Sequence, residues 1–375
     1  MLKNYFKIAI RNLSRHKLFS FINIFGLSLS MAICMLVLIH VNEQLSYDKF
    51  HSKADRIYRV ITELTNKQGS AFRYASTALP LAPALNTDYN FIEQSLRLYN
   101  AAAGFASTDK KEIAIKTAFT DPGFFDVFEF SLSSGNPATA LLQPNSIVLT
   151  SETATKLFGS DRNRNNPLGQ TISFTQLGSF QVTGVMADTK GKSHIDFEAY
   201  LSMSSVAALE KTGKLPAMLS VWNSQARTYT YVLLKEGSSQ KQLKNALNQV
   251  SASLLSTTKL QGKENFALDV QPFNKIILGE ELQHSIGNVG SKGKLLAEVL
   301  IGFIILLSAC FNYTNLSIAR SLNRGKEVGI RKVAGAFRYQ VFYQFILESV
   351  LISFLSLIAA FLILKAADRL YSSRW

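Results

Sequence analysis

Residues 319–341 read ARSLNRGKEVGIRKVAGAFRYQV and separate two long apolar segments. The stretch holds one acid, Glu327, and six basic residues: Arg320, Arg324, Lys326, Arg331, Lys332 and Arg338. Lys and Arg beside membrane helices stay on the cytoplasmic side of the membrane. Three glycines interrupt the stretch, which indicates a short helix with turns at its ends. The sequence therefore predicts a basic cytoplasmic loop between two membrane helices.

Three segments are long and apolar enough to cross a bilayer, at residues 18–41, 295–319 and 341–364. A helix needs about 20 apolar residues to span the hydrocarbon core. The fold class that follows is a membrane protein with three transmembrane helices and a large extracytoplasmic domain inserted between the first and second. The expected parts are a cytoplasmic helix (1–17), membrane helices (18–42, 293–319 and 341–365), the outer domain (43–292), the basic loop (320–340) and a tail (366–375).

The net charge of +14 lies mostly beside these apolar segments. Residues 1–17 carry five basic residues and no acid, and residues 320–338 carry six basic residues and one acid, so together they hold ten of the fourteen charges. This distribution is typical of positive-inside topology with some attraction to anionic lipid. It argues against nucleic-acid binding, which needs a basic face on the folded domain.

The N-terminal segment combines basic residues with an apolar face. Apolar side chains recur at helical spacing between Leu2 and Leu13, which predicts an amphipathic helix that lies in the membrane interface or packs on the helical bundle. The first apolar segment is too long for a signal peptide core, and no A-x-A-like site follows it, so we expect a retained anchor. Cys34 and Cys310 lie in different apolar segments at depths about 10 Å apart, so no disulfide is expected between them.

The outer domain mixes strand and helix patterns without a regular βαβ period, which predicts an α+β fold. Residues 56–64, 146–150, 228–237 and 266–273 have strand patterns, and residues 170–174 and 179–186 indicate neighbouring strands around a turn. Residues 151–159 and 238–255 have helix patterns. Ser151 is the expected N-cap of the first of these helices, and Gly159 its expected end.

Several stretches resemble one family. KEVGIRKVAGA followed by QFILES resembles the coupling segment of MacB/FtsX-type ABC transporter permeases, and LSYDKFHSKADRIYRV resembles the N-terminal part of the forms common in Bacteroidetes. DPGFFDVFEFSLSSGNP, SIVLTSETATKLFG, PLGQTISF and FQVTGVMAD resemble the MacB-like periplasmic core domain. The resemblance implies an outer domain of two lobes, the second near residues 100–200.

The same resemblance implies a role for the basic loop. In this family the loop docks into a groove on a separate ATPase subunit. The residues it assigns to ATPase coupling are Arg324, Glu327, Gly329, Arg331, Lys332, Gly335 and Ala336. The implied function is the membrane subunit of an ABC transporter of the inner membrane, in which ATP hydrolysis changes the conformation of the outer domain and thereby exports or extracts a substrate. The alternative is a non-transporting transmembrane signal transmitter that controls an extracytoplasmic partner.

The resemblance also implies a second permease unit, which would be another copy, a related chain or a missing second half. Family units carry four membrane helices whereas this chain has three, so we expect an incomplete permease. Membrane lipid and a periplasmic protein are further expected partners, and no cofactor is expected.

Three other groups of residues are candidates for chemistry. Residues 186–193 (MADTKGKS) approach a phosphate-binding loop, but Met186 replaces its first glycine, so ATPase activity is expected in a separate subunit. His194, Asp196 and Glu198 alternate and would share one face of a strand, so they are weak candidates for a metal site, although a solvated face is the more common reason for such a pattern.

The acids in the membrane segments form the third group. Glu298 lies near the outer end of the second segment, and Glu348 lies inside the third. Intramembrane acids are functional candidates. A proton relay is one hypothesis, and a structural ion partner for the basic loop or a neighbouring helix is the other.

Overall fold

The computed structural model describes residues 2–15, 17–65, 69–100, 103–109, 111–159, 166–189, 191–224, 227–256, 265–287, 289–323, 325–335 and 337–372. The chain divides into two compact units. A helical unit consists of Met1–Glu43 with Lys292–Trp375, and an outer unit consists of Gln44–Ser291. The insertion of the outer unit between the first two membrane helices agrees with the expected fold class.

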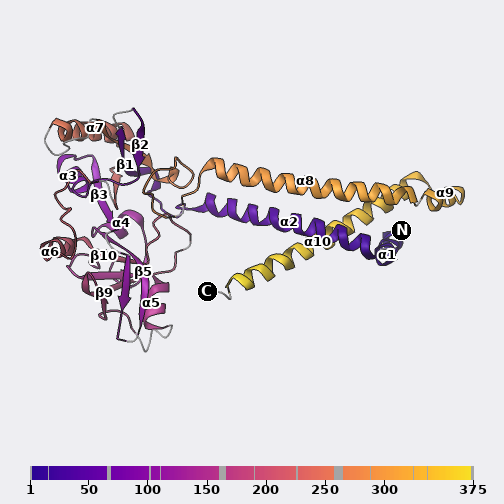
Figure 1. Ribbon diagram of the computed structural model, residues 1–375, viewed down its shortest axis with the longest axis horizontal. Coiled ribbons are helices and arrows are strands. Elements are labelled where there is room, and N and C mark those ends of the chain that lie inside the picture. Colours follow the sequence, from indigo (N-terminus) through magenta and orange to yellow (C-terminus); the bar gives the residue numbers. More distant parts are fainter. Residues whose placement is uncertain are drawn as a thin grey trace. The chain divides into compact units, whose positions relative to one another are not determined.

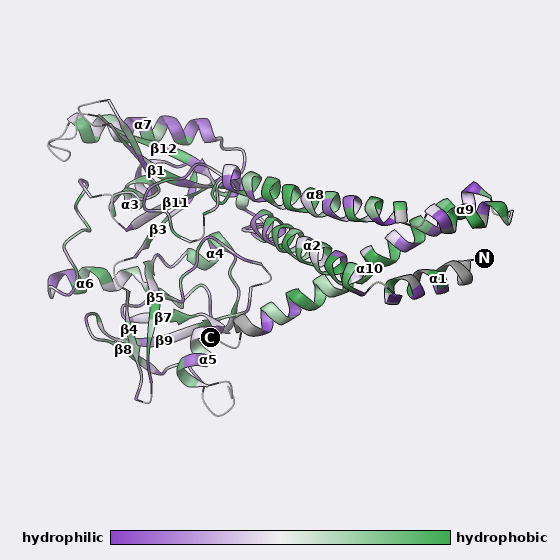
Figure 2. Cartoon of the chain, turned by 45° about the vertical axis from the view of Figure 1, so that its right-hand side comes forward, coloured by the Kyte–Doolittle hydropathy of each residue, from purple (hydrophilic) through white to green (hydrophobic). Residues whose placement is uncertain are grey.

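The helical unit contains three helices of membrane-spanning length. They are α2 (Lys17–Ser46), α8 (Lys292–Asn323) and α10 (Arg338–Ser372), and the shorter α1 (Leu2–Arg15) and α9 (Gly325–Val333) complete the unit (Figure 1). Figure 2 shows hydrophobic residues along most of the three long helices. Each has 30 residues or more, which exceeds the length needed to cross the hydrocarbon core. Helix α10 continues to Ser372, so residues 366–372 are helical where we expected a tail.

A small residue brings α2 and α8 together. A Cβ atom on Gly302 would lie 3.5 Å from Cγ2 of Val37, and Sγ of Cys34 donates a hydrogen bond to the Gly302 carbonyl oxygen at 3.3 Å. Close approach at small residues is the usual packing of membrane helices. Cys34 and Cys310 are both free, as predicted.

The outer unit is built on one mixed sheet, whose strands among the described residues number twelve. The strands are β1 (Ile57–Thr65), β2 (Ala71–Tyr74), β3 (Ile92–Tyr99), β4 (Ala103–Ser107), β5 (Glu112–Thr120), β6 (Leu132–Gly135), β7 (Ser146–Leu149), β8 (Thr171–Phe174), β9 (Gly178–Met186), β10 (Ala199–Ser202), β11 (Thr228–Leu234) and β12 (Asn265–Pro272). The helices are α3 (Leu81–Asp88), α4 (Phe124–Phe128), α5 (Ser151–Phe158), α6 (Val206–Lys211) and α7 (Gln240–Ser256).

Part of the sheet closes into a ring. Strand β10 pairs with both β7 and β5, so the order β10-β7-β9-β8-β4-β5 returns to its start. Buried apolar side chains from these strands, among them Phe119, Ile147 and Phe180, form one hydrophobic cluster. The ring strands span residues 103–202, the region where the resemblance placed a second lobe. Strands β3, β11, β1 and β12 continue from β5 as an open sheet, on which α3 and α7 pack.

Most local predictions for this unit are confirmed to within a few residues, but the N-cap of α5 differs from the predicted one. The N-cap of α5 is Thr150, whose side chain accepts a hydrogen bond from the Thr153 amide, whereas Ser151 is already helical. Thr150 has the extended backbone of an N-cap, with φ −67° and ψ 156°. Gly159 ends the helix with φ +91°, as expected.

Candidate functional site

The predicted coupling segment folds as helix α9 and the turn that follows it. Gly335 has φ +91°, and its amide donates a hydrogen bond to the Lys332 carbonyl, which is the left-handed ending that favours glycine. Gly329 lies inside α9, where no atom approaches within 4 Å of an added Cβ. Lys332 is exposed. Arg324 and Ala336 lie outside the described residues, and only the helical backbone is described at Glu327 and Arg331.

This segment also presents apolar side chains that the sequence analysis did not weigh. Val333 is 92% exposed, Ile330 is 71% exposed, and Phe337 is 63% exposed. Ile330 and Val333 are three residues apart and therefore lie on the same side of α9. Exposed apolar groups surrounded by charge mark interaction surfaces. The three-residue spacing of these two apolar residues is the sequence signal that indicates this surface.

The membrane acids occupy different settings within the helical unit. Oε2 of Glu298 lies 3.6 Å from Nε2 of His40 on α2, and both side chains are about half exposed in the chain alone. Glu348 lines a small cavity of about 50 Å³ together with Arg320 of α8 and Phe19 of α2. The Arg320 guanidinium lies 4.7 Å from the centre of the Phe19 ring. A base and an acid from two helices thus border one cavity, which favours the structural hypothesis for Glu348.

The structure contradicts the shared strand face of His194, Asp196 and Glu198. Residues 191–198 form no strand, because their backbone is held by contacts with distant segments. His194 is fully buried, whereas Asp196 is exposed and lies 3.8 Å from Nζ of Lys116. Glu198 accepts a hydrogen bond from the Lys116 amide. Among the described residues, no three His, Cys, Asp or Glu side chains converge as metal ligands would.

His194 belongs instead to a buried polar network around Asp48. The Asp48 carboxylate accepts hydrogen bonds from Oγ of Ser193 at 2.6 Å, from Nδ1 of His194 at 2.7 Å and from the His194 amide at 3.2 Å. The Asp48 amide donates to the Lys192 carbonyl at 2.9 Å, and Asp48 adopts φ +58°. Asp48 therefore fixes the chain directly after α2 to the 191–194 loop. That loop is the stretch with the incomplete phosphate-loop pattern.

The network continues into the centre of the sheet. Nε2 of His194 lies 2.8 Å from the hydroxyl of Tyr231 on β11. Because Nδ1 donates a hydrogen bond to Asp48, Nε2 of the neutral ring accepts a hydrogen bond from the Tyr231 hydroxyl. Arg59 of β1 is fully buried beside Tyr231 and donates to Oε1 of Gln271 at 2.6 Å. The positive charge of Arg59 and the negative charge of Asp48 thus flank a neutral His194 and Tyr231.

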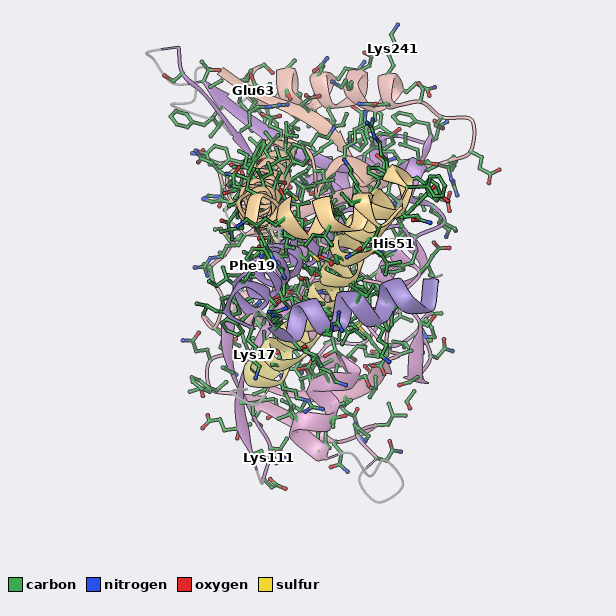
Figure 3. All side chains as sticks on the ribbon, turned by 90° about the vertical axis from the view of Figure 1, so that its right-hand side faces the viewer. Lys17, Phe19, His51, Glu63, Lys111 and Lys241 are labelled. Atoms are coloured by element: carbon green, nitrogen blue, oxygen red, sulfur yellow. The ribbon has the colours of Figure 1, made fainter. Side chains whose placement is uncertain are left out.

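His51, which is labelled in Figure 3, is a further buried neighbour of Asp48. Its Nδ1 donates to the Phe128 carbonyl at 2.6 Å, and its Nε2 lies 3.6 Å from Oδ1 of Asp48. The ring packs edge-on against Phe273. Asp48 and His51 are one helical turn apart in sequence, but nothing in the sequence showed that residues near position 194 would meet them.

Burial and pairing set the charges of this network. Burial alone would raise the pKa of the Asp48 carboxyl group, but its interactions with His194, His51 and Ser193 hold that pKa well below its usual range. Burial lowers the pKa of His194 more than Asp48 raises it. Burial likewise raises the pKa of Tyr231, against the opposing effect of Arg59.

These shifts predict that the outer domain loses stability in acid. Because the His194 pKa is lowered in the folded chain, the unfolded chain takes up a proton at a higher pH than the folded chain does. As the pH falls below about 6.5, the folded state therefore loses stability. The lowered pKa of Asp48 causes a further loss of stability as the pH falls below about 3.9. We expect the unfolding temperature of the full chain to fall between pH 7.5 and pH 5, and to fall less in the variant His194→Asn. An equal fall of the unfolding temperature in the wild type and in His194→Asn would contradict the role of His194 in the loss of stability.

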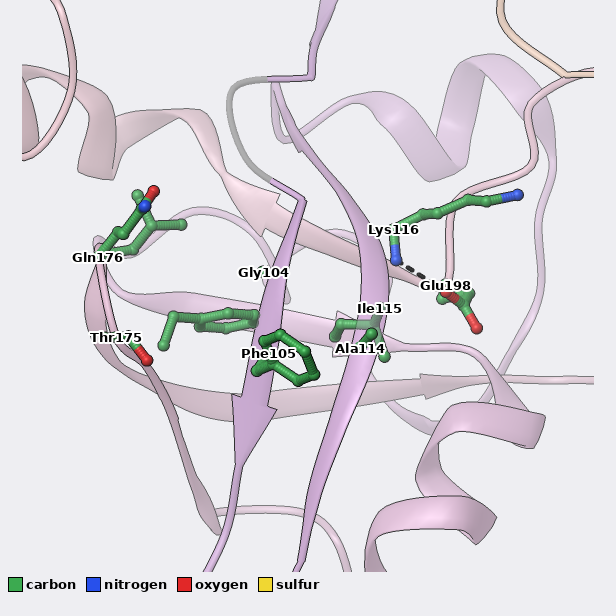
Figure 4. A pocket seen from close by; sticks show the side chains of 10 residues that line it. Gly104, Phe105, Ala114, Ile115, Lys116, Thr175, Gln176 and Glu198 are labelled. Carbon is green, nitrogen blue, oxygen red and sulfur yellow. Dashed lines mark hydrogen bonds between the residues drawn. The ribbon is translucent and has the colours of Figure 1, made fainter.

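A separate pocket of about 650 Å³ lies between β4, β5 and the turn from β8 to β9 (Figure 4). Phe105, Phe174 and Leu177 line its apolar part, and Glu198 closes one end. Phe105 is 57% exposed. The size and lining are those of small-molecule sites. The pocket shares no residue with the Asp48 network.

Comparison with known proteins assigns the family. Residues 20–250 match the MacB-like periplasmic core domain, and residues 299–375 match the FtsX-like permease C-terminal region. The chain belongs to the MacB/FtsX family of ABC transporter permeases. This MacB/FtsX-type permease is a multi-pass inner-membrane protein with a large periplasmic domain. Permeases of this family work with an ABC ATPase.

Individual relatives are distant. The macrolide export ATP-binding/permease protein MacB of Aggregatibacter actinomycetemcomitans is 26% identical over 244 residues, which are 64% of this chain and 33% of that protein. The chain thus spans about a third of the length of this curated relative.

Two bacterial proteins are among the solved structures that are similar to the chain. A domain of a putative permease from Porphyromonas gingivalis aligns with TM-score 0.50 and 20% identity, over 66% of this chain and 98% of that one. The periplasmic region of MacB from Actinobacillus actinomycetemcomitans aligns with TM-score 0.39 and 15% identity, over 58% and 90%.

Proposed function

We propose that this chain is the permease subunit that converts ATP hydrolysis by a separate ABC ATPase into movement of its periplasmic domain, and thereby exports or extracts a substrate. Two features together carry the proposal. An exposed helix, α9, connects two membrane-spanning helices, and a MacB-like domain precedes the first of these two helices in the chain. The name of the relative MacB combines export with ATP binding. A second permease unit would complete the transporter.

Helix α9 is the proposed docking element for the ATPase. Its exposed apolar residues Ile330 and Val333 would fill a hydrophobic groove, because binding energy concentrates in a few buried apolar contacts. The charged residues around them, Glu327, Arg331 and Lys332, would select the partner and its orientation. Gly335 ends the helix, so the docking surface stays short.

We expect the substitution Glu327→Lys to abolish association with the ATPase while membrane insertion is unchanged. Reversal of a charge at an interface places like charges together and removes complementarity. The measurement is the amount of cognate ATPase that co-purifies with the tagged permease from membranes. Val333→Asp is expected to have the same effect, because it removes the apolar contact.

The matched control is Glu236→Lys, which reverses an exposed acid in the periplasmic domain. This variant should co-purify with the ATPase at the wild-type level. Wild-type recovery of the ATPase with Glu327→Lys and Val333→Asp would show that α9 is not the docking element.

A further inference from the structure

Two segments connect the membrane helices to the sheet of the periplasmic domain. The first connector, residues 47–51, lies between α2 and the first turn before β1. The second connector, residues 283–287 and 289–291, lies between the loop that follows β12 and the start of α8. Both connectors belong to the outer unit, and they join it covalently to α2 and α8.

His194 contacts both connectors at once. Its side chain and amide hold Asp48 of the first connector, as described above. Its main chain meets the second connector at Gly287, where an added Cβ would lie 2.1 Å from the His194 carbonyl oxygen. The backbones of Gly287 and His194 therefore lie in close contact, at a position where a side chain would not fit.

The same residue is anchored in the sheet. Nε2 of His194 bonds to Tyr231 at the centre of β11, which pairs with β1 on one side and β3 on the other. Asp48, His194 and Tyr231 are buried, so a broken hydrogen bond among them would leave a polar atom without a partner in a dry environment. The free energy of the network therefore favours joint movement over separate movement of its parts.

We propose that His194 is a positioning residue that joins the first connector, the second connector and β11 into one mechanical unit. Force that enters through either membrane helix would then reach the middle of the sheet instead of bending a connector. The role in transport rests on the proposed function, but the linkage itself is a property of this chain alone.

The test is hydrogen–deuterium exchange on the full chain in lipid nanodiscs. Tyr231→Phe removes the hydroxyl that donates to Nε2 of His194 and accepts from Arg59, and it leaves the Asp48 bonds in place. Loss of a buried hydrogen bond corresponds to about tenfold in an opening equilibrium. We expect amide exchange to accelerate by about this factor in both connectors, and by the same factor in each, while α7 and the β8–β9 hairpin keep their rates.

The matched control is Tyr89→Phe, which deletes a hydroxyl bonded to the Ala246 carbonyl of α7 at 3.2 Å. It should leave both connectors unchanged. His194→Asn, which keeps a donor for Asp48 and removes Nε2, should reproduce Tyr231→Phe and serves if that variant does not fold. Acceleration in only one connector, in neither, or equally throughout the domain would overturn the proposal.

This experiment needs no ATPase. Failure of the co-purification test would therefore reject the proposed function and leave the linkage standing. Failure of the exchange test would reject the linkage and leave ATPase docking untouched.

Discussion

Replacement of Asp48 by alanine is expected to lower the free energy of unfolding of the periplasmic domain by about 3–5 kcal/mol. The reason is that Asp48 is buried and supplies the negative charge near Arg59, which is fully buried as well. Without the carboxylate, the guanidinium has no opposite charge in the network, and the donors of Ser193 and His194 lose their acceptor. A buried charge left uncompensated is among the most costly defects in a fold.

Urea unfolding of the full chain measures this effect. Trp222 is partly buried against the cluster formed by α7 and the open sheet, so its fluorescence reports on the periplasmic domain. The control is Asp196→Ala, which removes an acid whose ion pair with Lys116 is largely exposed. Exposed pairs contribute little, so no measurable change is expected for the control. A loss below about 1 kcal/mol in Asp48→Ala would show that the carboxylate does not balance Arg59.

The membrane architecture could be predicted because it depends on local properties of the sequence. The length of an apolar run and the sign of the charges beside it decide whether a helix spans the bilayer, and both are visible in residues 18–41 and 319–341. The strands with strong alternation, such as residues 179–186, were likewise identified from local pattern. The expected role of the basic loop came from the resemblance to the family and not from local pattern.

The buried network could not be predicted, because its members are brought together only by the fold. Asp48 and His194 are 146 residues apart and meet through a loop without regular structure. The metal hypothesis failed for a related reason, since alternation at His194, Asp196 and Glu198 implies a shared face only where the backbone is a strand. In the folded chain His194 is buried, whereas Asp196 is exposed.

The closure of the sheet into a ring could not be predicted from local sequence pattern either. Strand β10 pairs in parallel with β5 and antiparallel with β7, and these partners are set by packing of the ring interior. Alternation along each strand gives no information about such partners. The proposed mechanical unit depends on the sheet in this form, because β11 receives His194 and is joined to the ring through β3 and β5.

Gly287→Ala is expected to destabilise the periplasmic domain by about 3–4 kcal/mol. Two separate costs contribute. Gly287 has φ +69°, a conformation that costs an L-residue about 1–2 kcal/mol. The new Cβ would also lie 2.1 Å from the His194 carbonyl oxygen, so the second connector must move away from the 191–194 loop. Urea unfolding of the full chain measures the sum of both costs.

Gly213→Ala separates the two costs. Gly213 has φ +70°, nearly the same as Gly287, but no atom lies within 4 Å of an added Cβ. This variant should show only the conformational cost of about 1–2 kcal/mol. The difference between the variants then measures the contact of the second connector with His194. Equal destabilisation by both substitutions would mean that the second connector moves away from His194 at little cost in free energy. A connector that moves so easily would not pass force to the sheet, and it would not belong to the mechanical unit.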